Sequence, residues 1–251
     1  MRKYNFSPTL KASQNPTSIL GIVFDIDGTL LNHQLAQEIA IEDLYSKNRR
    51  KIPNSSLEEF KAMWKNKSEQ YMSEYLKGRI SFKLQRILRV QAVFSTWECQ
   101  LSSKAAWSIF NQYLRKYEQN WTLYEDVLPC LNTLKHYQLG IISNGDSIQQ
   151  RKKLAITGID FFFKSIIISN DIKISKPSSK IFKRSAEELK LSLCNIIYVG
   201  DNLETDVRGA LNAGIYGVWI NRTNQNYCDS EISMISTLKM LPEIINKIEK
   251  V

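Results

Sequence analysis

The chain has 251 residues, of which 43% are hydrophobic and 24% charged, and its formal net charge at pH 7 is +9. This length suffices for a sizeable core in one or two domains. No apolar run approaches the roughly 20 residues of a membrane span, and the polar start lacks the apolar segment of a secretory signal, so a membrane partner is not expected.

The distributions of cysteine and of charge indicate the cellular compartment and the possible classes of partner. The four cysteines, Cys99, Cys130, Cys194 and Cys228, are dispersed and form no paired motif. We therefore expect neither a disulfide framework nor a zinc site, and we place the protein in the reducing cytoplasm. From Gly28 to Asn120 there are 15 basic and 9 acidic residues. Such a surplus can attract nucleic acid, an anionic membrane or a small phosphorylated substrate, or simply form a solvated helical surface.

We predict a polar, flexible lead-in over residues 1–18 and a first strand directly after it. Residues 19–24 are a short apolar run of branched and aromatic side chains, typical of a buried strand in a parallel sheet. Asp25 and Asp27 come where this strand ends, and Gly28 allows a sharp turn. Neighbouring carboxylates repel each other, so they usually hold a cation. Strand ends in open α/β sheets are also where ligands bind.

From residue 33 to residue 118 the pattern is helical. Apolar residues recur at helical spacing, as at Phe60, Met63 and Trp64, and no convincing strand pattern interrupts them. This spacing favours burial of the aromatic side chains over a base-stacking surface, so nucleic acid is not the expected partner. The predicted helices cover residues 36–47, 57–76, 82–94 and 103–117.

Strands and helices alternate again from about residue 123. The predicted strands cover residues 139–142, 166–168, 196–199 and 217–220, and the predicted helices cover 127–137, 148–157, 177–189, 205–213 and 232–248. Repeated β-α units with apolar strands predict an α/β fold with a doubly wound parallel sheet. The predicted domains are an α/β core of residues 19–32 and 119–251 and a smaller all-α cap domain of residues 33–118.

Polar groups follow four predicted strands: Asp25 and Asp27, then Ser143 and Asn144, then Lys176, then Asp201 and Asp206. Parallel strands bring all four ends to one edge of the sheet. Phosphoryl transfer through a carboxylate needs such a set: a nucleophile, a proton donor, a hydroxyl and an amide for the phosphoryl oxygens, and a lysine that neutralises charge. A hard cation such as Mg²⁺ takes carboxylate oxygens as ligands and bridges to phosphate.

The order of these motifs resembles the haloacid dehalogenase (HAD) superfamily of phosphohydrolases. The motifs are Asp-x-Asp-Gly-Thr-Leu from Asp25, Ser-Asn-Gly from Ser143, Lys-Pro at Lys176 and Gly-Asp-x-x-x-x-Asp from Gly200. The helical insertion resembles a C1-type α-helical cap. The stretch from residue 199 to residue 214 is similar to the branch of nucleotidases and N-acylneuraminate-9-phosphatases. The resemblance covers residues 19–30 and 121–225, and the cap by position.

The resemblance implies a role for each motif residue. Asp25 is the nucleophile that forms an aspartyl-phosphate, and Asp27 is the general acid and base. Ser143, the Asn144 backbone and Lys176 bind the phosphate, and Lys176 also orients Asp25. To these we add Thr29, whose hydroxyl can bond the turn or an incoming anion. The Mg²⁺ site comprises Asp25, the backbone carbonyl of Asp27, Asp201 and Asp206, the last acting through water or by positioning Lys176.

The predicted function is Mg²⁺-dependent hydrolysis of a small phosphorylated metabolite, a nucleotide or sugar phosphate monoester. Three alternatives stay open: a phosphomutase, a haloacid dehalogenase, and a non-catalytic protein whose basic cap binds nucleic acid or a partner. A dehalogenase needs no proton donor and typically lacks the second aspartate, so Asp27 favours a phosphatase. The sequence gives neither the substrate nor the choice between monomer and homodimer.

Two cap arginines are candidates for substrate specificity. Arg86 and Arg89 follow a helix break at Gly78, and the planar arginine fork binds phosphate or carboxylate. We hypothesise that one of them contacts an anionic part of the substrate away from the scissile phosphate. The alternative is that both face water or pair with neighbouring acids.

Overall fold

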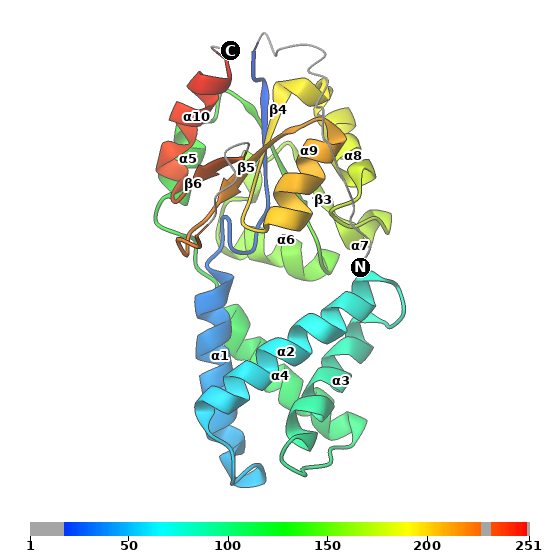
Figure 1. The fold of residues 1–251 in the computed structure, drawn as a ribbon. Helices are drawn as coiled ribbons and strands as arrows, with labels where there is room; N and C mark the ends of the chain where they lie inside the picture. The colour runs from blue at the N-terminus through cyan, green and yellow to red at the C-terminus, as the bar shows by residue number, and fades with distance from the viewer. Residues whose placement is uncertain (1–17, 227–231, 250–251) are drawn as a thin grey trace, which may run out of the picture.

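The computed structural model describes residues 18–226 and 232–249, so all but the last residue of the predicted lead-in lies outside the described part of the chain. Within it, a six-stranded sheet has the order β3-β2-β1-β4-β5-β6, and every neighbouring pair of strands is parallel. Figure 1 shows helices on both faces of this sheet. The predicted doubly wound α/β fold is therefore confirmed.

The strands are short, and the apolar strands β1 to β5 are mostly buried, whereas edge strand β6 exposes Met234. Their bounds are β1 (Gly21–Phe24), β2 (Gln138–Ser143), β3 (Ser165–Ile168), β4 (Ile196–Gly200), β5 (Tyr216–Ile220) and β6 (Ser233–Ile235). Central strand β1 pairs Phe24 with Ile141 of β2 and Val199 of β4. This register brings the residues after β1, β2 and β4 together at one edge.

The helices around the sheet are α5 (Val127–Thr133), α6 (Ser147–Ile156), α7 (Ser169–Ile172), α8 (Ser179–Leu189), α9 (Gly209–Ala213) and α10 (Leu241–Ile248). The predicted helix over 232–248 is wrong in its first part, because residues 233–235 form β6 beside β5. Proline fits only the first turn of a helix, and Pro242 stands in the first turn of α10. The predicted helix over 205–213 also differs, since Leu203–Arg208 forms a π-helical turn before α9.

Four helices make up the inserted segment: α1 (His33–Asn48), α2 (Leu57–Leu76), α3 (Phe82–Ser95) and α4 (Ser103–Gln119). Ser56 and Glu59 cap α2 reciprocally, which satisfies two backbone donors at its start. Phe60, Trp64 and Phe94 are fully buried between these helices. The prediction that the aromatic side chains form a helical core is confirmed for these three.

Figure 1 shows α1–α4 grouped together beyond the carboxyl ends of the strands. Polar contacts join the two parts, among them Tyr75 Oη to Asn170 Nδ2 at 2.8 Å and Arg86 to Gln149 Oε1 at 3.2 Å. We propose residues 33–118 as the cap domain and residues 19–32 and 119–251 as the core. None of the helices in the described ranges combines the length and apolar character that crossing a membrane requires.

Candidate active site

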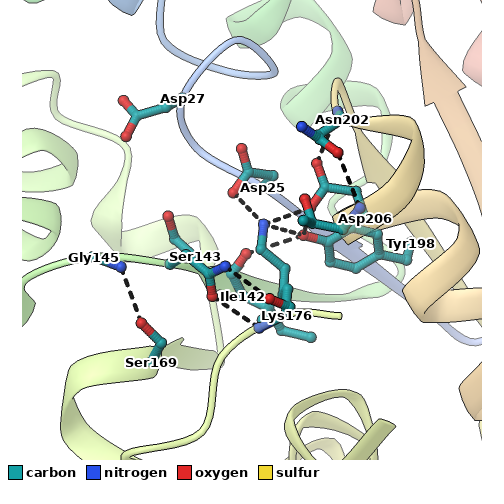
Figure 2. Close-up of polar contacts among 12 residues, drawn as sticks. Asp25, Asp27, Ile142, Ser143, Gly145, Ser169, Lys176, Tyr198, Asn202 and Asp206 are labelled. Carbon is teal, nitrogen blue, oxygen red and sulfur yellow. Dashed lines mark hydrogen bonds and ion pairs between the residues drawn. The ribbon is translucent and has the colours of Figure 1, made fainter. Parts of the chain in front are cut away.

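A buried lysine lies at the centre of the sheet edge (Figure 2). Lys176 Nζ is 2.7 Å from Asp25 Oδ1, 2.6 Å from Asp206 Oδ1 and 2.9 Å from Tyr198 Oη. Asp25 is the first residue after β1, and its backbone N–H donates to Val199 of β4. Three segments far apart in sequence therefore place one ammonium between two carboxylates, and the predicted neighbours Asp25, Lys176 and Asp206 are brought together.

Tyr198 and Asn202 fix the far side of this centre. The Tyr198 hydroxyl is 3.1 Å from the Ile142 carbonyl oxygen and 3.3 Å from Asp206 Oδ1. The backbone N–H of Asn202 donates to Asp206 Oδ2 at 3.0 Å. Sequence reasoning missed Tyr198, although its hydroxyl is the one polar side-chain group in the strand Ile-Ile-Tyr-Val-Gly.

Three carboxylates form a cluster that fits a hard divalent cation. Asp25, Asp201 and Asp206 each offer an oxygen atom, and these atoms lie within 4.8 Å of one another. Within the described residues Lys176 pairs with Asp25 and Asp206, whereas Asp201 takes part in no ion pair. Negative charge thus exceeds positive charge here, and oxygen donors of this kind suit Mg²⁺.

Burial and the excess of negative charge both raise the pKa of Asp25 and Asp201. Burial raises the pKa of Asp25 to about 7, Lys176 opposes the rise, and the carboxylates of Asp206 and Asp27 add to it. Burial and the neighbouring Asp25 and Asp206 carboxylates likewise hold the pKa of Asp201 well above its usual value. A bound cation would favour the charged forms of Asp25 and Asp201.

Gly28 makes close approach of Asp201 possible. Its φ is +85°, a left-handed conformation that favours glycine. A Cβ atom at this position would lie 2.1 Å from Asp201 Oδ2, far inside contact distance. The sharp turn after β1 therefore excludes any side chain where the Asp201 carboxylate packs.

Asp27 stands apart from Asp25 and Asp206 (Figure 2). Lys153 of α6 lies 2.7 and 2.6 Å from its two carboxylate oxygens, and Gln150 Nε2 donates to Oδ2 at 3.0 Å. Burial works to raise the pKa of Asp27, but Lys153, His33 and Gln150 together lower it to about 2. The Asp27 carboxylate lies outside the three-carboxylate cluster, so only its backbone carbonyl is available to the proposed metal site.

Sequence reasoning also missed Gln150 and Lys153. Lys153 is only 3% exposed, and its ammonium lies 5.6 Å and 5.7 Å from the ring centroids of Tyr117 and Trp121. Gln150 and Lys153 share a helix face with the buried Leu154. No clear signal in the sequence marks this face, because the apolar Ile148 and Ile156 of the same helix are exposed.

The predicted phosphate cradle follows β2. The buried Ser143 hydroxyl accepts a hydrogen bond from Gln150 at 2.7 Å. The Asn144 side chain instead holds the backbone of Lys176: Nδ2 donates to the Lys176 carbonyl at 3.1 Å, and the Lys176 N–H donates to Oδ1 at 2.9 Å. The buried Thr29 hydroxyl has no hydrogen-bond partner among the described residues.

A cavity of about 860 Å³ extends from this edge into the cap. Asp27 and Lys153 line it on the core side, and Arg86, Arg89 and Tyr113 line it on the cap side. Pockets of this volume hold small metabolites. The structure therefore places both cap arginines along the same cavity as Asp27.

Comparison with known proteins identifies the family. Residues 19–214 match the haloacid dehalogenase-like hydrolase family. The chain belongs to this family of hydrolases, as its motif order predicted. The solved structure of the HAD-hydrolase YfnB from Bacillus subtilis, bound to magnesium, has a TM-score of 0.75 and 25% identity, and the match covers 91% of this chain and 99% of that one.

Relatives bear the names of phosphatases and of a dehalogenase. The glyceraldehyde 3-phosphate phosphatase of Methanopyrus kandleri is 40% identical over 39% of this chain and 43% of the relative. The N-acylneuraminate-9-phosphatase of Rattus norvegicus is 34% identical over 52% of this chain and 55% of the relative. The (S)-2-haloacid dehalogenase 2 of Pseudomonas sp. (strain CBS-3) is 26% identical over 91% and 96%. The chain thus spans about half the length of the phosphatases it matches.

Proposed function

We propose that this hydrolase is a Mg²⁺-dependent phosphatase acting on a small phosphate monoester, a nucleotide or sugar phosphate, through an aspartyl-phosphate on Asp25. One observation carries the proposal: Lys176 holds Asp25 and Asp206 at 2.7 and 2.6 Å beside a cluster of three carboxylates. A lysine and a cation at a nucleophilic carboxylate are what a phosphoryl dianion needs in order to approach it.

In the first half-reaction an Asp25 oxygen attacks phosphorus and the ester P–O bond breaks. The leaving oxygen takes a proton from the Asp27 carboxyl group, so an alcohol departs. Lys176 keeps Asp25 oriented and offsets negative charge on the phosphoryl oxygens. The Ser143 hydroxyl and the backbone N–H of Asn144 donate to those oxygens.

In the second half-reaction water attacks the phosphorus of the aspartyl-phosphate. Asp27 takes the proton from that water, and the bond between phosphorus and the Asp25 oxygen breaks. Inorganic phosphate leaves, and Asp25 returns as a carboxylate. Asp27 is therefore an acid in one half-reaction and a base in the other.

The pairing of Asp27 with Lys153 suits the base role, because a pKa of about 2 keeps Asp27 ionised. The acid role needs a proton on the same group. Negative charge on a bound phosphoryl group would attract Lys153 and raise the pKa of Asp27, since a nearby like charge disfavours the carboxylate. We infer that substrate binding loosens the Asp27–Lys153 pair.

Asp25, Asp201 and the Asp27 backbone carbonyl would hold Mg²⁺, and Asp206 would support the site through Lys176 or water. When bound, the cation neutralises charge between the nucleophile and the phosphoryl group. The charge excess of the cluster supports this assignment, and so does the magnesium named for the YfnB structure. The phosphatase names of two relatives support the substrate class. We also propose a cytoplasmic setting, which the dispersed cysteines support.

A haloacid dehalogenase is the second candidate, because a relative aligned along most of its length carries that name. It would use Asp25 to displace halide from carbon, without a metal and without a proton donor. That displacement gives no role to the Asp27–Lys153 pair as a proton donor or to Asp201 as a metal ligand. These residues favour the phosphatase.

Release of inorganic phosphate from a panel of nucleotide and sugar phosphates tests the proposal, with 4-nitrophenyl phosphate as a general substrate. EDTA should abolish release, Mg²⁺ should restore it, and Ca²⁺ should support it poorly because its higher coordination misaligns Asp25. Full activity in EDTA contradicts the metal assignment. Chloride release from 2-chloropropionate without phosphate release from any ester establishes the dehalogenase instead.

A further inference from the structure

Arg89 is a buried cation without an acidic partner. Its side chain on α3 is only 6% exposed, and no described carboxylate pairs with it. Its guanidinium lies 5.8 Å from the ring centroid of Trp64 and 5.5 Å from that of Phe110. Burial lowers the pKa of Arg89 to about 10, so the group is still a cation at neutral pH. Removing such a charge from water is costly unless an anion compensates it.

Two buried hydrogen-bond donors at Arg89 and its neighbour Gln85 have no acceptor within the described residues. Arg89 donates one bond, to Gln85 Oε1 at 2.7 Å. Its Nε and the Gln85 Nε2 are both buried and lack a partner within the described residues. Both are donors, so the group that satisfies them must be an acceptor. Buried donors without acceptors are uncommon in folded proteins.

Arg86 adds a second cation one helical turn away. It is partly buried, lies 4.0 Å from the ring centroid of Phe82, and donates to Gln149 Oε1 of the core at 3.2 Å. It forms no ion pair with any described carboxylate. Gln85, Arg86 and Arg89 all line the cavity that reaches Asp27.

The acidic residues that line the cavity form no ion pair with Arg89. Glu38, Glu58 and Glu69 are exposed to solvent. Asp146 is half-buried and acts electrostatically on Arg86, and Asp27 is paired with Lys153 on the core side. The cap end of the cavity around Arg89 is therefore a positive, donor-rich pocket.

We propose that this pocket, formed by Gln85, Arg86 and Arg89, binds a second anionic group of the substrate, a carboxylate or a second phosphoryl group. The inference rests on the proposed phosphatase function and deepens it. The substrate is then a phosphate monoester with an anion at its other end. The scissile phosphate lies at Asp25 and the second anion lies against the arginine fork.

Matched substrate pairs test the pocket. All three substrate series have a phosphate ester at one end of an alkyl chain of two to six carbons. The other end carries a carboxylate in the first series, a second phosphate in the second series and a neutral hydroxymethyl group in the third. The wild-type enzyme should prefer an anionic member over its hydroxymethyl partner by about ten- to a hundredfold in kcat/KM at the fitting length, as expected for hydrogen bonds to a charged group. Arg89→Gln should remove this preference mainly through KM.

Binding provides a readout that does not depend on turnover. Titration calorimetry on Asp25→Asn should show the same preference in Kd, and Asp25→Asn/Arg89→Gln should lose it. Arg79→Gln is the matched control, because Arg79 is an exposed cap arginine paired with Glu74 and absent from the cavity lining. Arg89→Lys, which keeps the charge but loses the fork, serves if Arg89→Gln does not fold.

The outcomes are distinct. Preference for an anionic partner that Arg89→Gln loses and Arg79→Gln keeps supports the pocket, and the better of the carboxylate and bisphosphate series identifies the anion. Equal use of all three series at every length, with normal hydrolysis of 4-nitrophenyl phosphate, overturns the pocket and leaves the phosphatase intact. No phosphate release from any ester overturns the phosphatase itself, and calorimetry then decides the pocket alone.

Discussion

Lys153 Nζ lies 2.7 Å from Oδ1 and 2.6 Å from Oδ2 of Asp27. This partly buried ion pair joins the residue proposed as acid and base to helix α6. Although burial favours the neutral form, Lys153 is the largest of the influences that lower the pKa of Asp27 to about 2. The protonation state of Asp27 is therefore set by a residue outside the recognised motifs.

Lys153→Met should raise the pKa of Asp27, because burial then acts with less opposition. Asp27 must be ionised to take a proton from water in the second half-reaction, so the acidic limb of the pH dependence of kcat should move to higher pH. Turnover at neutral pH should fall by up to about 100-fold, within the range of acid–base catalysis. The measurement is phosphate release between pH 4 and 9. Lys152→Met is the control, since Lys152 pairs with Glu118 on the surface. Superimposable profiles for Lys153→Met and wild type contradict the coupling.

Asp25→Asn should reduce turnover by several orders of magnitude while the fold persists. The substitution keeps the shape of the side chain but removes the charge that attacks phosphorus. Lys176 retains Asp206 at 2.6 Å and the Tyr198 hydroxyl, so no buried cation is left alone. Phosphate release and the thermal midpoint are measured together. Near-normal turnover in a folded variant contradicts the aspartyl-phosphate mechanism.

Much of this site followed from sequence because its residues stand directly after strands. Apolar runs locate parallel strands, and the parallel arrangement brings Asp25, Ser143 and Asp201 to one edge. Tyr198 was missed because a strand pattern does not show which hydroxyl finds a buried lysine. Lys153 was missed because a lysine in a polar helix reads as surface; only the packing of α6 against the sheet edge and the cap buries it.

Strand β6 is a second feature that could not be predicted from the sequence. β6 is three residues long, too short for a period-2 pattern to stand out from the helix that follows. Its strand conformation comes from pairing with β5, which is a tertiary contact. The cap pocket has the same origin, since the isolation of Arg89 from acids depends on how α2, α3 and α4 pack.

Gly28→Ala should abolish Mg²⁺ binding in addition to lowering the stability of the fold. The added Cβ would meet Asp201 Oδ2 at 2.1 Å, so the carboxylate must move. Gly158→Ala is the matched control, because Gly158 also has a positive φ, +67°, but nothing lies within 4 Å of its added Cβ. Left-handed backbone costs about 1–2 kcal/mol per residue in either variant. Calorimetric titration with Mg²⁺ should detect binding in Gly158→Ala alone; equal affinity in both argues against Asp201 as a ligand.

Asp126 and Arg222 form a buried ion pair that supports the turn after β1. Arg222 donates to both Asp126 oxygens at 3.0 Å and to the Thr29 carbonyl at 2.7 Å. The Thr237 hydroxyl and the backbone N–H of Leu238 also donate to Asp126. Burial acts to raise the pKa of Asp126, but these donors outweigh it and hold the pKa below its usual value.

Asp126→Asn should lower the free energy of unfolding at pH 7 by about 3–5 kcal/mol, because it leaves Arg222 as an uncompensated buried cation. A carboxyl group with a depressed folded-state pKa stabilises the protein above its unfolded pKa of about 3.9. That contribution is lost as the pH falls through the folded-state value. The difference between wild type and Asp126→Asn should therefore be largest at neutral pH and shrink below about pH 4. Urea unfolding across this range measures this difference in the free energy of unfolding.

Asp171→Asn is the control, because it removes an exposed ion pair with Arg151. It should lower the free energy of unfolding by at most about 1 kcal/mol. A similar loss in both variants contradicts the special role of the buried pair.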